Sequence, residues 1–211
     1  MKKLGFFLFS KLGLLSFYSL KKSGYLHDKG WFKTFKLKRC VDQNGNPIPW
    51  MTYTFVDFLT PRLKKDFKVF EYGCGNSSLW WAKQVDDHTA CEHNKDWLRE
   101  VERNAPDNLK LIHRRTEGGE FAEAILEEAK KFDIIIIDGE DRNSCAESAV
   151  KAISENGIII WDNSDREAYQ QGYDHLINNG FKRLDFYGLG PINVMAWSTS
   201  VFYRPNNCLD I

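Results

Sequence analysis

Short hydrophobic runs alternate along the chain with segments in which apolar residues recur at helical spacing. Four runs, at positions 69–72, 88–92, 131–138 and 156–162, are only a few residues long. The isoleucine-rich run that ends at Asp138 is too short to span a membrane. Unbroken apolar runs of this length are typical of parallel strands that are buried on both faces. The pattern predicts an α/β protein with a parallel sheet.

The segments between these runs predict helices, and the end of the chain predicts a pair of strands. The expected helices are Trp50–Leu59, Ser77–Val85, Asn94–Asn104, Glu117–Lys131 and Asn143–Glu155, with Asn94 as a cap and Asn156-Gly157 as a stop. A further strand is expected at Leu109–His113. Two aromatic-rich runs, 181–187 and 195–204, flank a glycine-proline loop and predict a final antiparallel pair.

An acidic residue lies at the end of each of four predicted strands. These acids are Glu71, Glu92, Asp138 and Asp162. In an open parallel sheet the carboxyl ends of the strands line the binding crevice. We therefore expect the four carboxylates to lie along one rim of the sheet.

The first of these strands runs directly into a glycine turn. Gly73 and Gly75 allow the backbone to turn sharply and leave no Cβ between the chain and a bound ribose or amino-acid group, and Ser77 stands where a helix N-cap is expected. Glu92 follows about twenty residues later, where a ribose-binding carboxylate is expected. A single G-x-G is equally compatible with a tight strand-to-helix turn that binds nothing.

In the order of these motifs, the chain from about Trp50 to Arg204 resembles the class I S-adenosylmethionine-dependent methyltransferases. The sequence Glu71-Tyr-Gly-Cys-Gly-Asn-Ser77 resembles the family's acid-x-G-x-G turn, which holds the methionine part of the cofactor. Glu92 resembles the acid that binds the ribose hydroxyls, and Phe132–Gly139 resembles the fourth motif, beside the methyl group. The resemblance implies cofactor binding by Glu71, Gly73, Gly75, Asn76, Ser77, Glu92, His93 and Asp138.

The resemblance also implies a fold and an arrangement of domains. It implies a Rossmann-like sheet of seven strands in the order 3-2-1-4-5-7-6, with the last strand antiparallel and helices on both faces. A turn-rich stretch, Val41–Trp50, contains an Asn-Gly pair and two prolines. We expect it to separate an N-terminal extension and linker, residues 1–49, from a cofactor-binding domain, residues 50–211.

Within the family, the segments around Asp138 and Asp162 look like those of members that methylate oxygen. Some of these members, such as catechol O-methyltransferase, hold Mg²⁺ at positions that match Asp138, Asp162 and Asn163 here. The alternatives are that Asp138 or Asp162 is a general base, or that Asp162-Asn163 caps a helix starting near Asp165. Many relatives carry a His or Lys shortly after the fourth-strand acid, whereas this chain has Glu-Asp-Arg at positions 140–142.

The resemblance therefore predicts an enzyme that transfers a methyl group from S-adenosylmethionine to the hydroxyl of a small molecule or saccharide. A Rossmann-like protein that binds a nucleotide or a partner without catalysis is the second possibility. An NAD(P)-dependent oxidoreductase is a third, although Ser78 stands where the dinucleotide-binding motif requires its last glycine.

Composition adds a cellular setting. The 14% of aromatic residues excludes a disordered chain. Five cysteines without a C-x-x-C pair favour reduced thiols in the cytoplasm over a disulfide framework or a zinc site. Net charge is zero, but residues 1–39 hold ten Lys or Arg against the single acid Asp28. The front of the chain is basic and the remainder is acidic.

The basic front of the chain also holds an apolar segment, Leu4–Leu20, between two lysine pairs. It is at the short limit for a membrane span and contains Lys11 near its middle. Four possibilities stay open: a helix over the protein's own core, a helix on a membrane surface, a dimerisation helix that makes a homodimer, and a lid. Nucleic acid is not an expected partner, because the basic residues alternate with Phe and Leu rather than forming a polar stripe.

Overall fold

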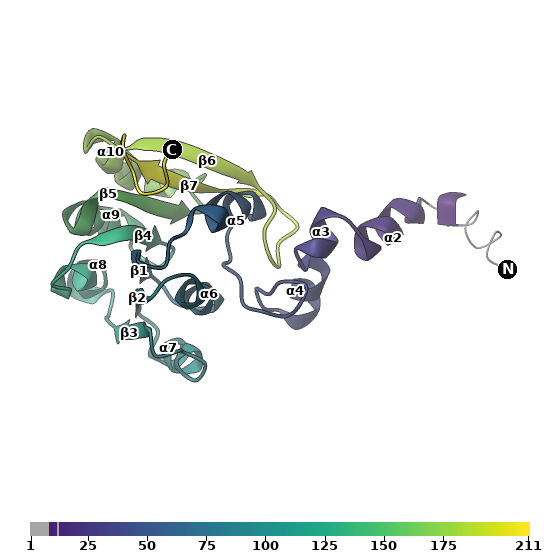
Figure 1. Ribbon diagram of the computed structural model, residues 1–211, viewed down its shortest axis with the longest axis horizontal. Helices are drawn as coiled ribbons and strands as arrows, with labels where there is room; N and C mark the ends of the chain where they lie inside the picture. Colours follow the sequence, from purple (N-terminus) through teal and green to yellow (C-terminus); the bar gives the residue numbers. More distant parts are fainter. Residues whose placement is uncertain (1–8, 12) are drawn as a thin grey trace.

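A computed structural model describes residues 9–11 and 13–211 of the chain. Its centre is a seven-stranded sheet in the order β3-β2-β1-β4-β5-β7-β6 (Figure 1). The strands are β1 Lys68–Tyr72, β2 Asp87–Glu92, β3 Leu109–His113, β4 Phe132–Ile137, β5 Ile153–Asp162, β6 Lys182–Gly188 and β7 Trp197–Tyr203. The first five are parallel, and β7 runs antiparallel to both β5 and β6. The predicted strand order is confirmed.

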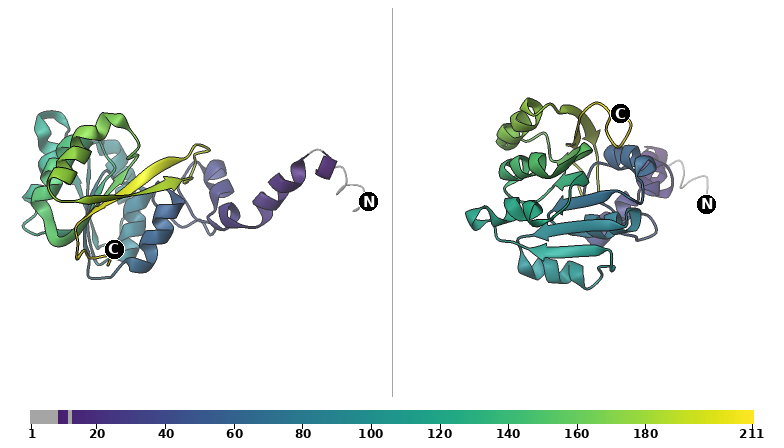
Figure 2. Two further views of the ribbon diagram at one scale, coloured as in Figure 1. Left: turned by 90° about the horizontal axis from the view of Figure 1, so that it is seen from above. Right: turned by 60° about the vertical axis from the view of Figure 1, so that its left-hand side comes forward.

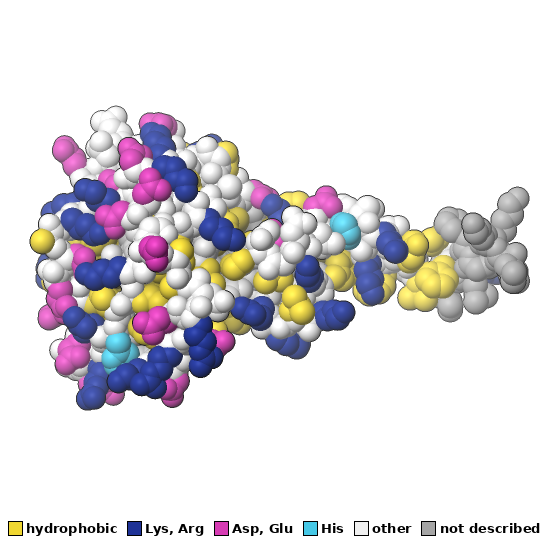
Figure 3. All heavy atoms as spheres, turned by 60° about the horizontal axis from the view of Figure 1, so that its bottom comes forward, with side chains coloured by type: hydrophobic (Ala, Val, Ile, Leu, Met, Phe, Trp, Pro, Cys, Tyr) yellow, Lys and Arg dark blue, Asp and Glu magenta, His cyan; other side chains and the backbone are white. Residues whose placement is uncertain are grey.

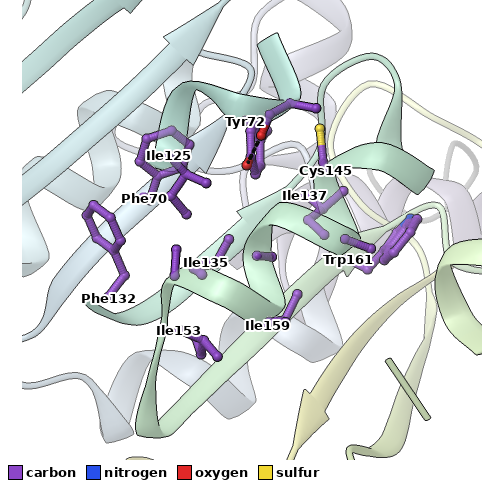
Figure 4. Close-up of a cluster of buried hydrophobic side chains, with 14 of the residues drawn as sticks. Phe70, Tyr72, Ile125, Phe132, Ile135, Ile137, Cys145, Ile153, Ile159 and Trp161 are labelled. Carbon is purple, nitrogen blue, oxygen red and sulfur yellow. Dashed lines mark hydrogen bonds between the residues drawn. The ribbon is translucent and has the colours of Figure 1, made fainter. Parts of the chain in front are cut away.

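Successive side chains of the central strands point to opposite faces of the sheet, and both faces are covered. This explains why these strands are apolar throughout. Ile134 and Ile136 of β4 pack into a cluster on one face of the sheet, whereas Ile135 and Ile137 pack into the cluster on the other face. Figure 4 shows part of the second cluster, with Ile137 beside Trp161 of β5, and Ile135 pairs with Ile159 farther along the same two strands. Because each face is covered, all four isoleucines of the strand are buried, as the uninterrupted isoleucine run predicts.

Helices cover both faces of the sheet (Figure 2). One face is covered by α5 Tyr53–Leu59, α6 Asn76–Gln84 and α7 Lys95–Glu102. The other is covered by α8 Glu120–Glu123, α9 Arg142–Ala152 and α10 Gln170–Asn178. Short 3-10 turns lie at Thr60–Arg62, Glu117–Gly119, Ala124–Glu127 and Glu167–Tyr169. This arrangement leaves the carboxyl ends of the parallel strands open along one edge.

Two helix predictions are wrong in their extent. In place of a helix at Glu117–Lys131 the chain has a 3-10 turn, α8 and a second 3-10 turn, because Gly118 and Gly119 both adopt positive φ, 73° and 83°. Helix α9 ends at Ala152, so Asn156-Gly157 does not stop it but lies inside β5. A Cβ on Gly157 would lie 2.6 Å from the Ile153 side chain, which explains the glycine there.

The described part of the N-terminal arm includes the helices α2 Leu14–Lys22, α3 Tyr25–Asp28 and α4 Trp31–Leu37. Helix α2 has no buried residue, and Figure 1 shows it extending away from the sheet domain, whereas Tyr25 of α3 donates a hydrogen bond of 2.8 Å to Asp57 of α5. The described part of the predicted apolar segment therefore does not cover the core, while positions 4–8 and 12 lie outside the described residues. No helix among the described residues is long and apolar enough to cross a membrane.

In contrast to α2, helix α4 is attached to the sheet domain. Thr34 is fully buried, and its Oγ1 accepts a hydrogen bond of 2.9 Å from the backbone N–H of Ile192. The indole N–H of Trp31 donates to the carbonyl of Asn193 at 3.0 Å. Both acceptor and donor on the domain side belong to the loop between β6 and β7. The arm from α4 onward is thus a fixed part of the structure around the strand ends.

Candidate functional site

The glycine turn joins β1 to α6 at the open edge of the sheet. Gly73 has φ 92°, which favours glycine, and its N–H donates to the carbonyl of Cys91 at 2.7 Å. A Cβ there would approach the backbone of Gly139 to 3.4 Å, so the turn lies directly beside the end of β4. Gly75, rather than the expected Ser77, is the N-cap residue, and Ser77 lies in the first turn of α6.

Glu71 acts inside this turn. Its side chain is 1% exposed, and its Oε2 accepts a hydrogen bond from the Ser78 hydroxyl and lies 3.5 Å from the imidazole of His88. The Ser78 oxygen in turn accepts the N–H of Gly75 at 3.1 Å. The pair therefore fixes the shape of the turn. The sequence marked Ser78 only as a missing glycine, and its position three residues after a glycine N-cap was the available signal for this role.

Glu92 closes the turn from the neighbouring strand. Its Oε2 accepts the N–H of Cys74 at 3.1 Å, and its Oε1 accepts the N–H of Asn94 at 2.7 Å. The Nδ1 atom of His93 lies 3.1 Å from the same Oε1. A carboxylate has about four lone-pair positions, so acceptor capacity remains for further donors. Glu92 is thus held in place by backbone groups while bordering open space.

Trp97 was not identified from the sequence. Asn94 caps α7 as predicted, its side chain accepting the N–H groups of Asp96 at 3.1 Å and Trp97 at 3.0 Å. The cap directs the first turn of α7 back to the glycine turn, where the indole N–H of Trp97 donates to the carbonyl of Cys74 at 2.6 Å. The ring is about half exposed. The clue in the sequence was an aromatic residue in the first turn of a helix whose N-cap, Asn94, directly follows a predicted strand.

These residues enclose a cavity of about 300 Å³ at the strand ends. It is lined by Glu71, Gly73, Cys74, Ser77, Glu92, His93, Asn94, Trp97, Asp138, Gly139, Glu140 and Arg142. Gly75 and Asn76 lie instead on a second, adjoining cavity of about 570 Å³. The structure therefore brings all of the expected cofactor residues to two neighbouring cavities of a size that small-molecule ligands occupy. The residues fit a nucleoside cofactor, since Glu92 offers acceptors to hydroxyls and Trp97 offers a flat face.

At the end of β4, Asp138 is paired with a residue that the prediction left without a role. Arg142, 7% exposed, lies 3.1 Å from Asp138 Oδ1 through its Nη2 and also donates to the carbonyls of Gly139, at 2.8 Å, and Asp162. A single guanidinium thus joins the ends of β4 and β5. Burial, together with repulsion from the nearby Asp162 carboxylate, raises the pKa of Asp138 well above its usual range, although Arg142 opposes the shift.

Asp162, at the end of β5, is turned into the protein. Its Oδ1 accepts a hydrogen bond of 2.9 Å from the indole of Trp197 and one of 2.6 Å from the hydroxyl of Thr199, both on β7. Burial raises the pKa of Asp162 to about 6, and these hydrogen bonds limit the rise. The side chain caps no helix, because the turn that follows starts at Glu167. It lines neither cavity.

The predicted Mg²⁺ site at Asp138, Asp162 and Asn163 receives no support from this geometry. Arg142 already supplies the positive charge at Asp138, and Asp162 Oδ1 is occupied by two donors. In residues 9–11 and 13–211 there is no group of three His, Cys, Asp or Glu placed to hold a metal ion. The three predicted ligand residues therefore do not fit a metal ion.

Cys74 lies inside the turn but is not an activated thiol. Burial raises its pKa, and the carboxylates of Glu92 and Glu71 raise it further. A thiol becomes nucleophilic when its pKa is lowered, so this environment does the opposite. Cys74 lines the cavity as a small neutral group.

Comparison with known proteins identifies the fold. No protein-family model and no curated protein sequence matches the chain. Among solved structures, precorrin-6y C5,15-methyltransferase from Geobacter metallireducens GS-15 superposes with a TM-score of 0.58 at 14% identity, over 72% of this chain and 87% of that one. A protein assigned as a caffeoyl-CoA O-methyltransferase from Staphylococcus aureus gives 0.57 at 15% identity, over 92% and 99%.

Spermidine synthase from Thermotoga maritima is also similar, with a TM-score of 0.55 at 14% identity over 70% of this chain and 56% of that one. Identities this low establish the arrangement of strands and helices and leave the chemistry to the site. In its strand order, its reversed β7 and its glycine turn after β1, the chain has the fold of the class I methyltransferases.

Proposed function

We propose that the protein is an S-adenosylmethionine-dependent methyltransferase that acts on a hydroxyl of a small molecule or saccharide. The observation that supports this most directly is the arrangement of Glu92. Its carboxylate closes the glycine turn through Cys74 and Asn94 and still borders the cavity at the strand ends. An acid fixed in this way can accept two neighbouring hydroxyls of a ribose.

Four residues of the first cavity have distinct roles in this proposal. Glu92 would bind the ribose hydroxyls, the indole of Trp97 would pack on a flat group, and the turn at Gly73 would leave room for the amino-acid end. When bound, S-adenosylmethionine supplies a methyl group made electrophilic by its sulfonium sulfur. Glu71 would act indirectly, since its hydrogen bonds with Ser78 hold the turn.

Asp138 is the proposed general base. It borders both cavities, so an acceptor hydroxyl in the second cavity and the cofactor in the first would meet beside it. Its raised pKa strengthens it as a proton acceptor relative to an ordinary carboxylate. Asp162, the other acid considered from the sequence, lines neither cavity and is held by β7, so it is the weaker choice.

Calorimetric titration with S-adenosylhomocysteine, NAD and NADP tests the proposal. We expect binding of S-adenosylhomocysteine alone, and a loss of about 1.5–3 kcal/mol of binding free energy in Glu92→Ala, which removes charge-assisted hydrogen bonds. Glu92→Gln, which keeps one acceptor oxygen, should show an intermediate loss, and Glu102→Ala is the control because that exposed acid of α7 lines neither cavity. Binding of NAD or NADP in its place, or equal affinity in Glu92→Ala, would contradict the proposal.

We further propose that the protein is cytoplasmic and binds anionic membrane surfaces through its arm. Exposed Phe9, Leu14, Phe17, Tyr18 and Leu20 lie there close to the lysines at positions 11, 21 and 22, and Figure 3 shows hydrophobic and basic side chains together along the arm. Apolar side chains and Lys next to anionic lipid both favour binding at the interface, at about 1 kcal/mol per Lys. The five cysteines are all free thiols, as a reducing compartment requires.

Flotation with anionic and neutral vesicles tests the role of the arm, comparing the full chain with a protein that starts at Gly24. We expect the full chain alone to float, more strongly with anionic vesicles and less at high salt. Gel filtration of the same two proteins tests the other occupant, a second copy. Equal behaviour of the two proteins with vesicles, or a dimer that only the full chain forms without lipid, would overturn the membrane proposal.

A further inference from the structure

The second cavity is formed by segments far apart in the chain. It measures about 570 Å³ and shares Cys74, Ser77, Trp97 and Asp138 with the first cavity, so the two adjoin at the end of β4. Its remaining wall comes from the start of α6, from the arm after α4, from Trp50, from the end of α7 and the residues just after it, and from the β6–β7 loop. The glycine-turn motif accounts for the part of this wall near α6 but not for the parts contributed by the arm and the β6–β7 loop.

Two residues in the wall of the second cavity adopt backbone conformations that are unfavourable for their side chains. Lys38 has φ 53° and Ile192 has φ 66°; every other non-glycine described residue with positive φ is Asn or Asp, which tolerate it. Both residues line this cavity. Strained positions persist where surrounding contacts fix them, and they gather at ligand clamps.

The contacts that fix this wall are specific hydrogen bonds. The Asn76 side chain at the start of α6 donates to the carbonyl of Cys40 at 2.6 Å, and the N–H of Ile192 donates to Thr34 at 2.9 Å. Each joins the arm to an element of the sheet domain. The cavity is therefore part of the folded structure and not a gap beside a loose arm.

The charges on this cavity are unbalanced. Its two acids, Glu100 and Asp138, are each paired with an arginine, Arg103 and Arg142 respectively. Its two cations, Lys38 and Arg39, are exposed and form no ion pair with any described residue. A ligand in this cavity thus meets two free positive charges at the arm and no free negative charge.

Two indoles give the cavity flat apolar surfaces. Trp50 and Trp97 are each about half exposed, and both line it. Trp97 is held by its hydrogen bond to Cys74, so its exposed face has a fixed orientation. Leu79 and Val101 add apolar surface to the wall of the same cavity. Half-exposed, fixed indoles are suited to packing on a planar ring or on the apolar face of a sugar.

We propose that this cavity binds the methyl acceptor, and that the acceptor is a hydroxylated ring carrying an anionic group. Lys38 and Arg39 would bind the anionic group, Trp50 would pack on the ring, and the reacting hydroxyl would lie beside Asp138, which borders both cavities. This inference rests on the proposed function, because it assigns the second cavity to the acceptor of that reaction.

Binding measurements on the protein saturated with S-adenosylhomocysteine test the inference. The probes are dihydroxybenzoate against neutral catechol, and glucuronate against neutral glucose, followed by tryptophan fluorescence. We expect at least one anionic probe to bind about tenfold or more tightly than its neutral partner, equivalent to about 1.4 kcal/mol. Preference for the first pair identifies an aromatic acceptor, and preference for the second identifies a sugar acid.

Variants of the cavity wall locate the effect. The double variant Lys38→Met with Arg39→Met should abolish the anionic preference, whereas Lys36→Met, an exposed lysine of α4 outside the cavity, should retain it. Trp50→Leu should weaken the charged and neutral probes of a pair by the same factor, with Tyr187→Leu as the matched exposed aromatic outside the cavity.

The failure of this inference is distinguishable from failure of the proposed function. If S-adenosylhomocysteine binds but no anionic probe is preferred, or if the preference survives in the Lys38 and Arg39 double variant, the acceptor assignment is overturned and the methyltransferase proposal stands. If S-adenosylhomocysteine itself does not bind, the proposed function fails first, and the acceptor assignment fails with it.

Discussion

The acids that end β2 and β5 look equivalent in sequence and have different surroundings in the structure. Glu92 accepts two backbone N–H groups, from Cys74 and Asn94, and borders the first cavity. Asp162 accepts two side-chain donors, Trp197 and Thr199, and borders no cavity. The acid of β2 thus faces a cavity, whereas the acid of β5 holds β7.

The difference shows which carboxylates remain available for a ligand. Backbone N–H groups hold Glu92 from one side and leave acceptor positions open toward the cavity. At the β4–β5 end the acids are instead held by the protein itself, Asp138 by the guanidinium of Arg142 and Asp162 by the uncharged donors on β7. An acid at a strand end is thus insufficient evidence for a metal site, because the cation that balances it can be an arginine of the same chain.

The largest expected effect is that of removing the guanidinium from the β4–β5 end. Arg142→Met takes away the partner of Asp138 and the donor to three carbonyls, leaving a largely buried carboxylate unbalanced. We expect the free energy of unfolding to fall by about 3 kcal/mol, measured by urea denaturation. Arg99→Met, at an exposed ion pair on α7, is the control and should change it by less than about 1 kcal/mol.

A small effect of Arg142→Met would break the comparison, since it would mean that the acids of the β4–β5 end do not depend on an internal cation. Arg142→Lys sharpens the test. The lysine keeps the charge but cannot bind Asp138 and the backbone carbonyls together. The free energy of unfolding of Arg142→Lys should therefore lie between that of the wild type and that of Arg142→Met.

The next effect concerns pH. Because burial raises the pKa of Asp162 to about 6, the folded state keeps a proton that the unfolded state releases from about pH 4 upward. Stability from this group is therefore fully present below about pH 4 and is lost as pH rises to about 6. Asp162→Asn removes the titration, so the unfolding free energy of the wild type should fall relative to the variant by at most about 1.4 kcal/mol per pH unit.

Urea denaturation of both proteins from pH 4 to pH 7 makes this measurement. If the wild type instead gains stability relative to Asp162→Asn over that window, the carboxylate is stabilised by its hydrogen bonds more than it is penalised by burial. The β5 acid would then resemble Glu92 more closely than the structure indicates.

The smallest expected effect separates two neighbouring serines of α6. Ser78→Ala removes the hydroxyl that binds Glu71 and Gly75, and should lower the unfolding free energy by about 1–2 kcal/mol. Ser77→Ala is the matched control, since Ser77 lines both cavities. It should leave the stability unchanged and weaken S-adenosylhomocysteine in calorimetry. The reverse pattern would exchange the two roles and place Ser78 at the ligand.

Much of the fold follows from local signals. The alternation of short apolar runs and helical segments predicts the strands correctly, because β4 and its neighbours must be apolar to be buried on both faces. The prediction of a helix at 117–131 is wrong because it followed the helical spacing of the apolar residues and gave too little weight to the Gly118-Gly119 pair. Both glycines adopt positive φ values, which interrupt a helix. The same bias placed a helix stop at Asn156-Gly157, where the glycine makes room for Ile153 within β5.

The sequence by itself determined the glycine turn, the acid at its side and the cap at Asn94, since the partners of these groups are a strand end and the next few backbone N–H groups. Only the tertiary structure decided that Arg142 binds Asp138, that β7 holds Asp162, and that Thr34 reaches Ile192 to complete the second cavity. Those contacts join segments whose proximity depends on the path of the loops and the reversal of β7. A polar side chain carries no local sign of a partner that the fold brings to it from a distant part of the chain.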